Sequence, residues 1–288
     1  MKALEKIKEI TAFLENCGID DAHKESEIIV THCLGIDKTA LYRDNPVLSE
    51  KNIKDVDVVL RRCAQREPLQ YILGYVEFYG LKIKVGKGVL IPRPETELLA
   101  EEVIKQFTVH SSQFTVLDLC TGSGCLALAI AKRFPDAEVY GTDISKDAIR
   151  YANENARLND IRNVTFLKGS LFEPLKQLVT RHPSPVTFNM IVSNPPYIRS
   201  SDIANLQPEI KKWEPRNALD GGEDGLNYYR TILSEARKYL MLNGVVFLEI
   251  GEGQAAEVSE IAMQNGFRNI SVIKDYAGIE RIVTVRAL

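Results

Sequence analysis

The chain contains 288 residues, of which 45% are hydrophobic and 26% are charged, and its formal net charge is −3. This composition indicates a soluble globular protein with one large domain or two domains of moderate size. The slight acidic excess argues against a protein whose main task is to bind nucleic-acid phosphates, because that task needs clustered Lys and Arg.

Cysteine spacing and hydropathy indicate the compartment. The five cysteines are scattered and contain no C-x-x-C pair, which is typical of reduced thiols rather than of disulfides or a zinc site. The four histidines show no metal-ligand spacing, so we expect no metal. No apolar run approaches the length of a membrane span, and the amphipathic N-terminal segment does not resemble a signal peptide. We expect a cytoplasmic protein.

Residues 1–75 show the periodicity of helices. Apolar residues recur on one face of the first segment, at Leu4, Ile7, Ile10 and Leu14. A second helix is expected over DAHKESEIIVTHCLG, ending at Gly35, and a third begins after Ser49, which we expect to cap it. These segments predict a small N-terminal helical bundle over residues 1–75.

The next segment, residues 76–92, has the alternation of a β-hairpin. Apolar and polar residues alternate over YVEFYGLKIKV. Pro92 and Pro94 then lead into a helix that begins near Glu95. We therefore expect a hairpin linker over residues 76–92 and a second domain over residues 93–288.

Strands and helices alternate from residue 115 onward. The strand candidates are TVLDL, AEVYGTD, NVTFLKG, FNMIVSN and GVVFLEI, and the helices between them include CLALAIAKRF, SKDAIRYANENARLN and LNYYRTILSEARKYLML. This alternation predicts an α/β domain with a parallel, doubly wound sheet that has helices on both faces. Only YAG separates the last two strands, NISVIKD and IERIVTVRA. That linker is too short for a parallel crossover, so we expect these strands to pair antiparallel.

A glycine-rich turn follows the first of these strands, in VLDLCTGSGCLALAIA. Gly122 and Gly124 permit positive φ and a close approach of backbone to ligand, and the following helix offers free N–H groups. Asp143 ends the next strand about 20 residues later, where a carboxylate can bind ribose hydroxyls. The pattern predicts a nucleotide cofactor. It also fits the dinucleotide fingerprint G-x-G-x-x-G/A, so a nicotinamide dehydrogenase and a turn with a purely structural role are alternatives.

The fourth strand ends in the rigid turn Asn194-Pro195-Pro196-Tyr197. Each proline fixes its own φ and extends the residue before it, so the main-chain oxygens of this turn are not used by a helix. Ligands of parallel sheets gather at the carboxyl ends of the strands. We therefore expect this turn, the glycine turn and Asp143 to meet at one edge of the sheet.

This turn suits the methylation of an amino group that is conjugated to a π system. The lone pair of such a nitrogen is delocalised, so the nitrogen is a poor nucleophile and becomes positive when alkylated. The Asn194 side-chain oxygen and the Pro195 main-chain oxygen can accept its two N–H bonds and stabilise the developing charge. Tyr197 offers a flat face for the planar group. A Pro-Pro turn capped by Asn194 and a proline-rich ligand for a WW module are the alternative interpretations.

Several motifs of this sequence resemble motifs of known methyltransferases. Asp118 in a D-x-x-x-G-x-G arrangement and the antiparallel end of the sheet are similar to class I S-adenosylmethionine-dependent methyltransferases. N-P-P-Y resembles the enzymes of that class that act on planar amino groups. PLQYILG, VLIPRPETELL and EPRNALDGGEDGLNYYR resemble in particular the HemK/PrmC family of protein-(glutamine-N5) methyltransferases, over nearly the whole chain. The resemblance implies a Rossmann-like, mostly parallel seven-stranded sheet with an antiparallel last strand.

The resemblance also implies a reaction and a site. A methyl group would pass from S-adenosylmethionine, leaving S-adenosylhomocysteine, to the glutamine of the Gly-Gly-Gln motif of class-1 peptide-chain release factors. The implied cofactor-binding residues are Cys120, Thr121, Gly122, Ser123, Gly124, Asp143, Ser170, Leu171 and Asn194. The implied substrate-binding residues are Asn194, Pro195, Pro196 and Tyr197, with Arg93, Pro94 and Glu95 at the substrate entrance. Cys120 stands where glycine is common in the family, and Ser170 and Leu171 stand where many relatives carry an acidic and an aromatic residue.

The catalytic residues expected from these observations are Asn194, Pro195 and Tyr197. An adenine-N6 nucleic-acid methyltransferase is the main alternative, but the sequence has no basic stripe and no evident target-recognition domain. We therefore expect residues 1–75 to dock the release factor. We also expect a monomer, with no membrane partner and no direct contact with nucleic acid.

Overall fold

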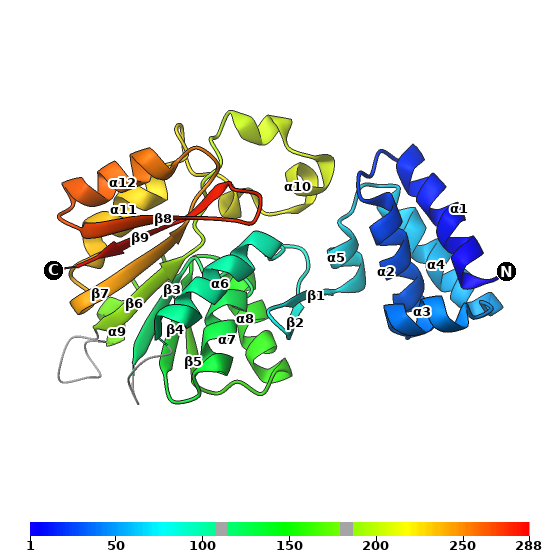
Figure 1. Ribbon diagram of the computed structural model, residues 1–288, viewed down its shortest axis with the longest axis horizontal. Coiled ribbons are helices and arrows are strands. Elements are labelled where there is room, and N and C mark those ends of the chain that lie inside the picture. The colour runs from blue at the N-terminus through cyan, green and yellow to red at the C-terminus, as the bar shows by residue number, and fades with distance from the viewer. Residues whose placement is uncertain (108–113, 179–186, 288) are drawn as a thin grey trace. The chain divides into compact units, whose positions relative to one another are not determined.

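A computed structural model describes residues 1–107, 114–178 and 187–287 (Figure 1). The chain forms two compact units. The first comprises Met1–Gly74 together with Gln207–Trp213, and we call it the helical unit. The second comprises Tyr75–Leu206 together with Glu214–Leu288, and we call it the sheet unit. In the described ranges, no helix is both long and apolar enough to cross a membrane.

The helical unit contains α1 (Ala3–Asn16), α2 (Ala22–Leu34), α3 (Lys38–Asp44), α4 (Glu50–Cys63), α5 (Leu69–Leu73) and α10 (Pro208–Trp213). The three expected helices are confirmed as α1, α2 and α4. Ser49 caps α4, since its hydroxyl accepts the Asn52 N–H at 3.2 Å, and Gly35 ends α2 in the left-handed conformation. The short helices α3 and α5 were not expected. Buried aliphatic side chains of α1, α2 and α4 form the core of this unit.

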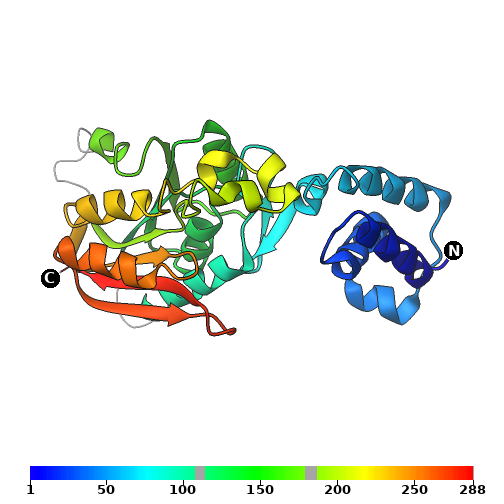
Figure 2. The same ribbon diagram turned by 90° about the horizontal axis from the view of Figure 1, so that it is seen from above.

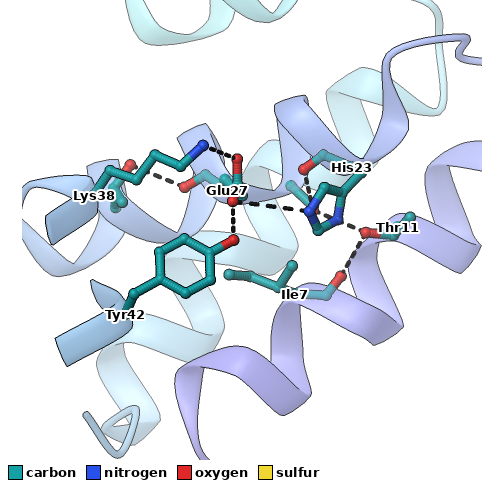
Figure 3. A network of polar contacts seen from close by, with 8 residues as sticks. Ile7, Thr11, His23, Glu27, Lys38 and Tyr42 are labelled. Atoms are coloured by element: carbon teal, nitrogen blue, oxygen red, sulfur yellow. Dashed lines mark hydrogen bonds and ion pairs between the residues drawn. The ribbon is translucent and has the colours of Figure 1, made fainter. Parts of the chain in front are cut away.

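A polar network joins α2 to α3 beside that core (Figure 3). The Glu27 carboxylate of α2 accepts a hydrogen bond from Lys38 Nζ at 2.7 Å and another from the Tyr42 hydroxyl. His23 Nε2 lies 3.8 Å from the same carboxylate. The Glu27 side chain is buried, so these donors compensate a charge that would otherwise be costly to remove from water.

The core of the sheet unit is a seven-stranded sheet with the strand order β5-β4-β3-β6-β7-β9-β8. These strands are β3 (Thr115–Leu119), β4 (Glu138–Asp143), β5 (Val164–Lys168), β6 (Phe188–Ser193), β7 (Leu240–Glu249), β8 (Arg268–Lys274) and β9 (Glu280–Arg286). Strands β3 to β7 pair in parallel, and β9 pairs antiparallel with both β7 and β8. The expected fold class, including the antiparallel last strand, is confirmed.

Helices cover both faces of this sheet. The helices α6 (Pro94–Phe107), α7 (Cys125–Arg133) and α8 (Lys146–Leu158) lie together on one face. The helices α11 (Asn227–Ala236) and α12 (Ala255–Gln264) lie together on the other, as Figures 1 and 2 show. The unit also contains α9 (Leu175–Leu178) and two short 3₁₀ turns, Asp202–Asn205 and Arg216–Ala218.

The expected hairpin is present as β1 (Tyr75–Phe78) and β2 (Leu81–Lys84), which pair antiparallel. Asn155 of α8 holds β2 in place, because its fully buried side chain bonds the Lys84 N–H at 2.7 Å and the Lys84 carbonyl at 3.1 Å. The same amide donates to the Ser123 carbonyl at 2.9 Å. One side chain thus connects the hairpin to the glycine turn.

One sequence expectation about the elements was wrong. The helix expected through Leu242 ends at Ala236, and β7 begins at Leu240, not at Gly244. Leu240 is buried and pairs with Phe188 of β6, and the Phe188 N–H bonds the Tyr239 carbonyl at 2.7 Å. Pairing with the sheet therefore outweighs the helical propensity of the local residues.

Candidate active site

An open cavity of about 930 Å³ lies in the sheet unit at the carboxyl ends of β3, β4 and β6. Its wall comes from the glycine turn, the residues after β4, the run from Gly88 to Thr96, the turn after β6 and the segment around Asn217. The expected meeting of the two turns at one sheet edge therefore occurs around a single cavity.

The glycine turn runs from β3 into α7. Its main chain is tied to β4, since the Thr121 N–H bonds the Thr142 carbonyl at 3.0 Å. Cys120 has a φ of 59°, in the left-handed region that glycine tolerates best. Gly124 has a φ of 80°, and a Cβ there would lie 2.9 Å from Phe166 Cζ. Cys120, Thr121, Gly122 and Ser123 line the cavity. Gly124 does not, and its glycine is required by packing instead.

Asp118 supports the glycine turn through hydrogen bonds to its side chain. Its buried carboxylate accepts the Thr121 hydroxyl at 2.6 Å and the Ala127 N–H at 3.2 Å. Burial raises the pKa of Asp118 to about 7, and these two hydrogen bonds counteract part of that effect. Asp118 reaches the cavity wall, but its bonded oxygen holds the start of α7 against the turn.

Asp143 occupies the end of β4 and lines the cavity. One carboxylate oxygen accepts the Gly122 N–H at 2.9 Å, and the other accepts the Ser145 N–H at 2.8 Å. Burial raises the pKa of Asp143, while both main-chain donors favour the charged form. Each oxygen retains a lone pair for a further donor, as ribose binding requires.

The turn after β6 presents Asn194 and Pro196 to the cavity. Asn194 Nδ2 donates to Thr96 Oγ1 of α6 at 3.0 Å. Pro195 and Tyr197 are outside the cavity lining, and Tyr197 borders a second hollow with Gln254 and Gly251. The Tyr197 hydroxyl lies 3.5 Å from the Glu249 carboxylate, and burial raises the pKa of Tyr197.

The three residues expected at the substrate entrance do not line the cavity, although their neighbours Pro92 and Thr96 do. The Arg93 guanidinium instead bonds the buried Glu214 carboxylate at 2.6 Å, and Pro94 begins α6. Arg93 therefore fastens the start of α6 to the segment that contributes Asn217. Ser170 and Leu171 do line the cavity, and Leu171 has a φ of 45°.

Several lining residues were missed by sequence reasoning. Thr96, Cys125, Asn217 and Tyr228 are the chemically notable ones. Asn217 and Tyr228 lie inside EPRNALDGGEDGLNYYR, so the family resemblance pointed to their segment but not to their roles. Thr96 had no local signal, because one threonine in the first turn of a helix is unremarkable.

The residues present fit a nucleoside-type cofactor. The Thr142 hydroxyl is buried in the cavity wall and has no hydrogen-bond partner among the described residues. A buried polar atom of this kind calls for a partner from outside the chain. Asp143 supplies acceptors, and the apolar surfaces of Leu90, Leu126 and Leu171 suit a planar ring.

Comparisons with known proteins agree with this geometry. The family model of a PrmC N-terminal domain matches residues 5–74, and that of a methyltransferase domain matches residues 110–247. A release factor glutamine methyltransferase of Thermodesulfovibrio yellowstonii is 48% identical over 99% of this chain and 98% of its own length. One from Geobacter sulfurreducens is 43% identical over 94% of this chain and 92% of its own length.

A solved structure of a methyltransferase from Pyrococcus furiosus shares the fold, with a TM-score of 0.52 and 21% identity over 72% of this chain and 89% of that one. The full-length similarity at 48% identity shows more than the fold. The chain is therefore a member of the release factor glutamine methyltransferase family.

Proposed function

We propose that this chain transfers a methyl group from S-adenosylmethionine to the side-chain amide nitrogen (N5) of the glutamine in the Gly-Gly-Gln motif of class-1 peptide-chain release factors. The observation that carries the proposal is that Asp143, at the end of β4, and Asn194, just after β6, line one cavity, although β3 lies between these two strands. Similarity over the full length to proteins named release factor glutamine methyltransferase supports the same substrate.

The cofactor side of the cavity is formed by Cys120 to Ser123 of the glycine turn, by Asp143 and by Ser170 and Leu171. S-adenosylmethionine, when bound, supplies an electrophilic methyl group on a sulfonium. Asp143 would accept hydrogen bonds from the ribose hydroxyls, because both of its oxygens are already oriented by main-chain N–H groups. Leu171 would contribute apolar surface beside the adenine.

The proposed acceptor side is the turn Asn194 to Tyr197, of which Asn194 and Pro196 line the cavity. The Asn194 side-chain oxygen and the Pro195 main-chain oxygen would accept the two N–H bonds of the glutamine amide and aim its nitrogen at the methyl carbon. The nitrogen gains positive charge as its bond to the methyl carbon forms and the carbon–sulfur bond breaks, so these oxygens stabilise the transition state more than the ground state. One N–H proton of the amide is then released to water, which leaves a neutral N-methyl amide. Tyr197 would pack against the planar amide, which is its role in the expectation from sequence.

The helical unit is the part of the chain proposed to dock the release factor, and the reaction is proposed to take place in the cytoplasm. Residues 5–74 of this unit match the PrmC N-terminal domain, which supports a role specific to this family. We propose that the enzyme acts as a monomer and makes no direct contact with nucleic acid.

The proposal is tested by incubating the purified chain with a methyl-labelled donor and a purified class-1 release factor. Mass spectrometry should place the label on the glutamine of the Gly-Gly-Gln motif. A release factor with Gln→Asn at that position is the matched control and should remain unlabelled. Label that persists in this control would contradict the substrate, and label on DNA or RNA would support the adenine-N6 alternative. Thermal stabilisation by NADH but not by S-adenosylmethionine would favour a dehydrogenase.

A further inference from the structure

The Asn194 side chain bonds a buried threonine at the cavity wall. Asn194 and Thr96 both line the cavity, and Asn194 Nδ2 donates to Thr96 Oγ1 at 3.0 Å. Thr96 sits in the first turn of α6 and is 2% exposed. A buried contact from a helix to a turn on another element is fixed by the fold, not by local chain geometry. The NH2 group of Asn194 therefore has a defined partner within the protein.

The carboxylate of Glu249, at the end of β7, has a buried oxygen, Oε2, with no hydrogen-bond partner among the residues that the structure describes. Glu249 is 2% exposed, and burial raises its pKa to about 7, while the nearby hydroxyls of Thr96 and Tyr197 lower that pKa in part. A hydroxyl has one proton to donate. When the Thr96 proton points toward Glu249, its oxygen lone pairs are left for Asn194, and the donor order runs from Asn194 through Thr96 to Glu249.

This order matters because the two ends of an amide have opposite character. If the NH2 group of Asn194 is held by Thr96, the side-chain oxygen is the end left for the cavity. If the amide were rotated by a half turn, the NH2 group would face the N–H donors of a substrate amide, and the contact would become repulsive. The two orientations are nearly equal in shape, so packing alone does not choose between them.

We propose that Thr96 is a positioning residue for methyl transfer: by accepting the Asn194 N–H, it selects the orientation of Asn194 in which the side-chain oxygen faces the substrate amide. This inference rests on the role proposed for Asn194. It assigns a function to a threonine that neither touches the reacting atoms nor stands out in the sequence.

Thr96→Val tests the proposal, because valine keeps the shape and removes the hydroxyl. We expect kcat to fall about 10- to 100-fold, the size of effect seen when a catalytic contact is misplaced or one polar contact is lost. The KM for release factor and the Kd for S-adenosylmethionine should change little, since the contact acts in the transition state. Thr96→Ser keeps the hydroxyl and should restore most of the turnover. If Thr96→Val does not fold, Thr96→Ala replaces it.

Thr115→Val is the matched control. Thr115 also uses its hydroxyl, donating to the Thr187 carbonyl at 2.9 Å, but it lies at the start of β3, at the sheet edge opposite the cavity. This variant should retain its kcat. Full turnover in Thr96→Val, or equal losses in Thr96→Val and Thr96→Ser, would overturn the positioning role. Full turnover in Asn194→Ala would instead overturn the role of Asn194 itself, so the two failures are distinct.

Discussion

At the scale of the residue, Asp143 has two tasks. Its carboxylate fixes the glycine turn through the Gly122 N–H and the start of α8 through the Ser145 N–H. The same group lines the cavity, where its remaining lone pairs face outward. A single side chain therefore shapes the glycine turn and, in the proposed function, also binds the cofactor. Asn194, by contrast, holds no main-chain group of the cofactor loop in the described structure.

This difference predicts that substitution of Asp143 chiefly weakens cofactor binding and that substitution of Asn194 chiefly lowers turnover. Asp143→Ala removes the acceptor of two main-chain N–H groups, each such bond to a charged group being worth about 1.5–3 kcal/mol. We expect the affinity for S-adenosylmethionine to fall by at least about tenfold, a difference of about 1.4 kcal/mol. Asn194→Ala should leave that affinity less affected and remove most of the turnover. Calorimetry of cofactor binding and single-turnover assays measure the two effects.

The control for this pair is Asp136→Ala. Asp136 is an exposed carboxylate just before β4, at the opposite end of the strand from Asp143. Its replacement by alanine therefore removes the same charge without changing the cavity. Its cofactor affinity should equal that of the unsubstituted chain. If Asp143→Ala spared the affinity and Asn194→Ala reduced it, the roles assigned to the two residues would have to be exchanged.

The cavity residues divide into those that a sequence can predict and those that it cannot. Asp143 and Asn194 each end a parallel strand, so alternation of strands and helices is enough to place them at one edge. Thr96 reaches the cavity only because α6 lies beside the end of β6, and that contact spans 98 residues of chain. Gly124 was expected to approach the cofactor, but its neighbours Phe166 and Ala152 come from β5 and α8. Pairings between distant elements decide such roles.

At the scale of the element, the glycine turn is closely packed against the neighbouring helix and strand. A Cβ at Gly124 would lie 2.9 Å from Phe166 Cζ and 3.0 Å from Ala152 Cβ. Asn155 binds the Ser123 carbonyl from the same helix as Ala152. The turn is therefore held by α8 on one side and by β4 on the other.

Gly124→Ala tests this packing. The substitution should cost about 1–2 kcal/mol for an L-residue in the left-handed region, and a further roughly 1–3 kcal/mol for overpacking against Phe166 and Ala152. Gly278→Ala, in the turn between β8 and β9, separates the two costs. Gly278 has a φ of 82°, close to the 80° of Gly124, but a Cβ there meets no atom within 4 Å.

Urea unfolding of both variants gives the comparison. Gly278→Ala should lose only the conformational part, and the additional loss in Gly124→Ala reports the steric part. Equal losses would mean that α8 and β5 shift freely to admit the extra carbon. In that case the turn would be adaptable, and its glycine would have to be explained by the ligand.

At the scale of the whole molecule, the chain passes between the two units more than once. Residues 207–213 belong to the helical unit, although Asn194 and Asn217 on either side of them line the cavity of the sheet unit. The sequence predicted a simple succession of domains, because a segment of seven residues gives no local sign of the unit it packs against. Its attachment depends on partners far away in the chain, and we find these in Arg66 and Asp20.

Arg66 is the main attachment of this segment. Its guanidinium forms a two-pronged ion pair with Glu209, in which Nη2 lies 2.7 Å from Oε2, and it also donates to the carbonyls of Cys17 and Gly18 at 2.9 and 2.8 Å. Both charged side chains are about four-fifths buried. Paired guanidinium and carboxylate groups with this geometry are the stronger class of ion pair.

Glu209→Gln should release residues 207–213 from the helical unit while Arg66 keeps its two carbonyl partners. We expect backbone amides of this segment, such as Ile210 and Lys211, to exchange with deuterium about tenfold faster, which corresponds to about 1.4 kcal/mol of local stability. Mass spectrometry of the peptide that covers the segment measures the exchange. Amides of β3 and β6 in the sheet unit should keep their protection.

Asp44→Asn is the matched control for Glu209→Gln. It breaks the ion pair with Arg43, which joins two adjacent and exposed residues of the helical unit, and such pairs contribute little to stability. Exchange over 207–213 should be unchanged in this variant. If Glu209→Gln also left that exchange unchanged, Gln207 and its 2.9 Å bond to Asp20 would have to hold the segment instead. Turnover of the Glu209→Gln variant would then show whether the order of residues 207–213 reaches the flanking turns that carry Asn194 and Asn217.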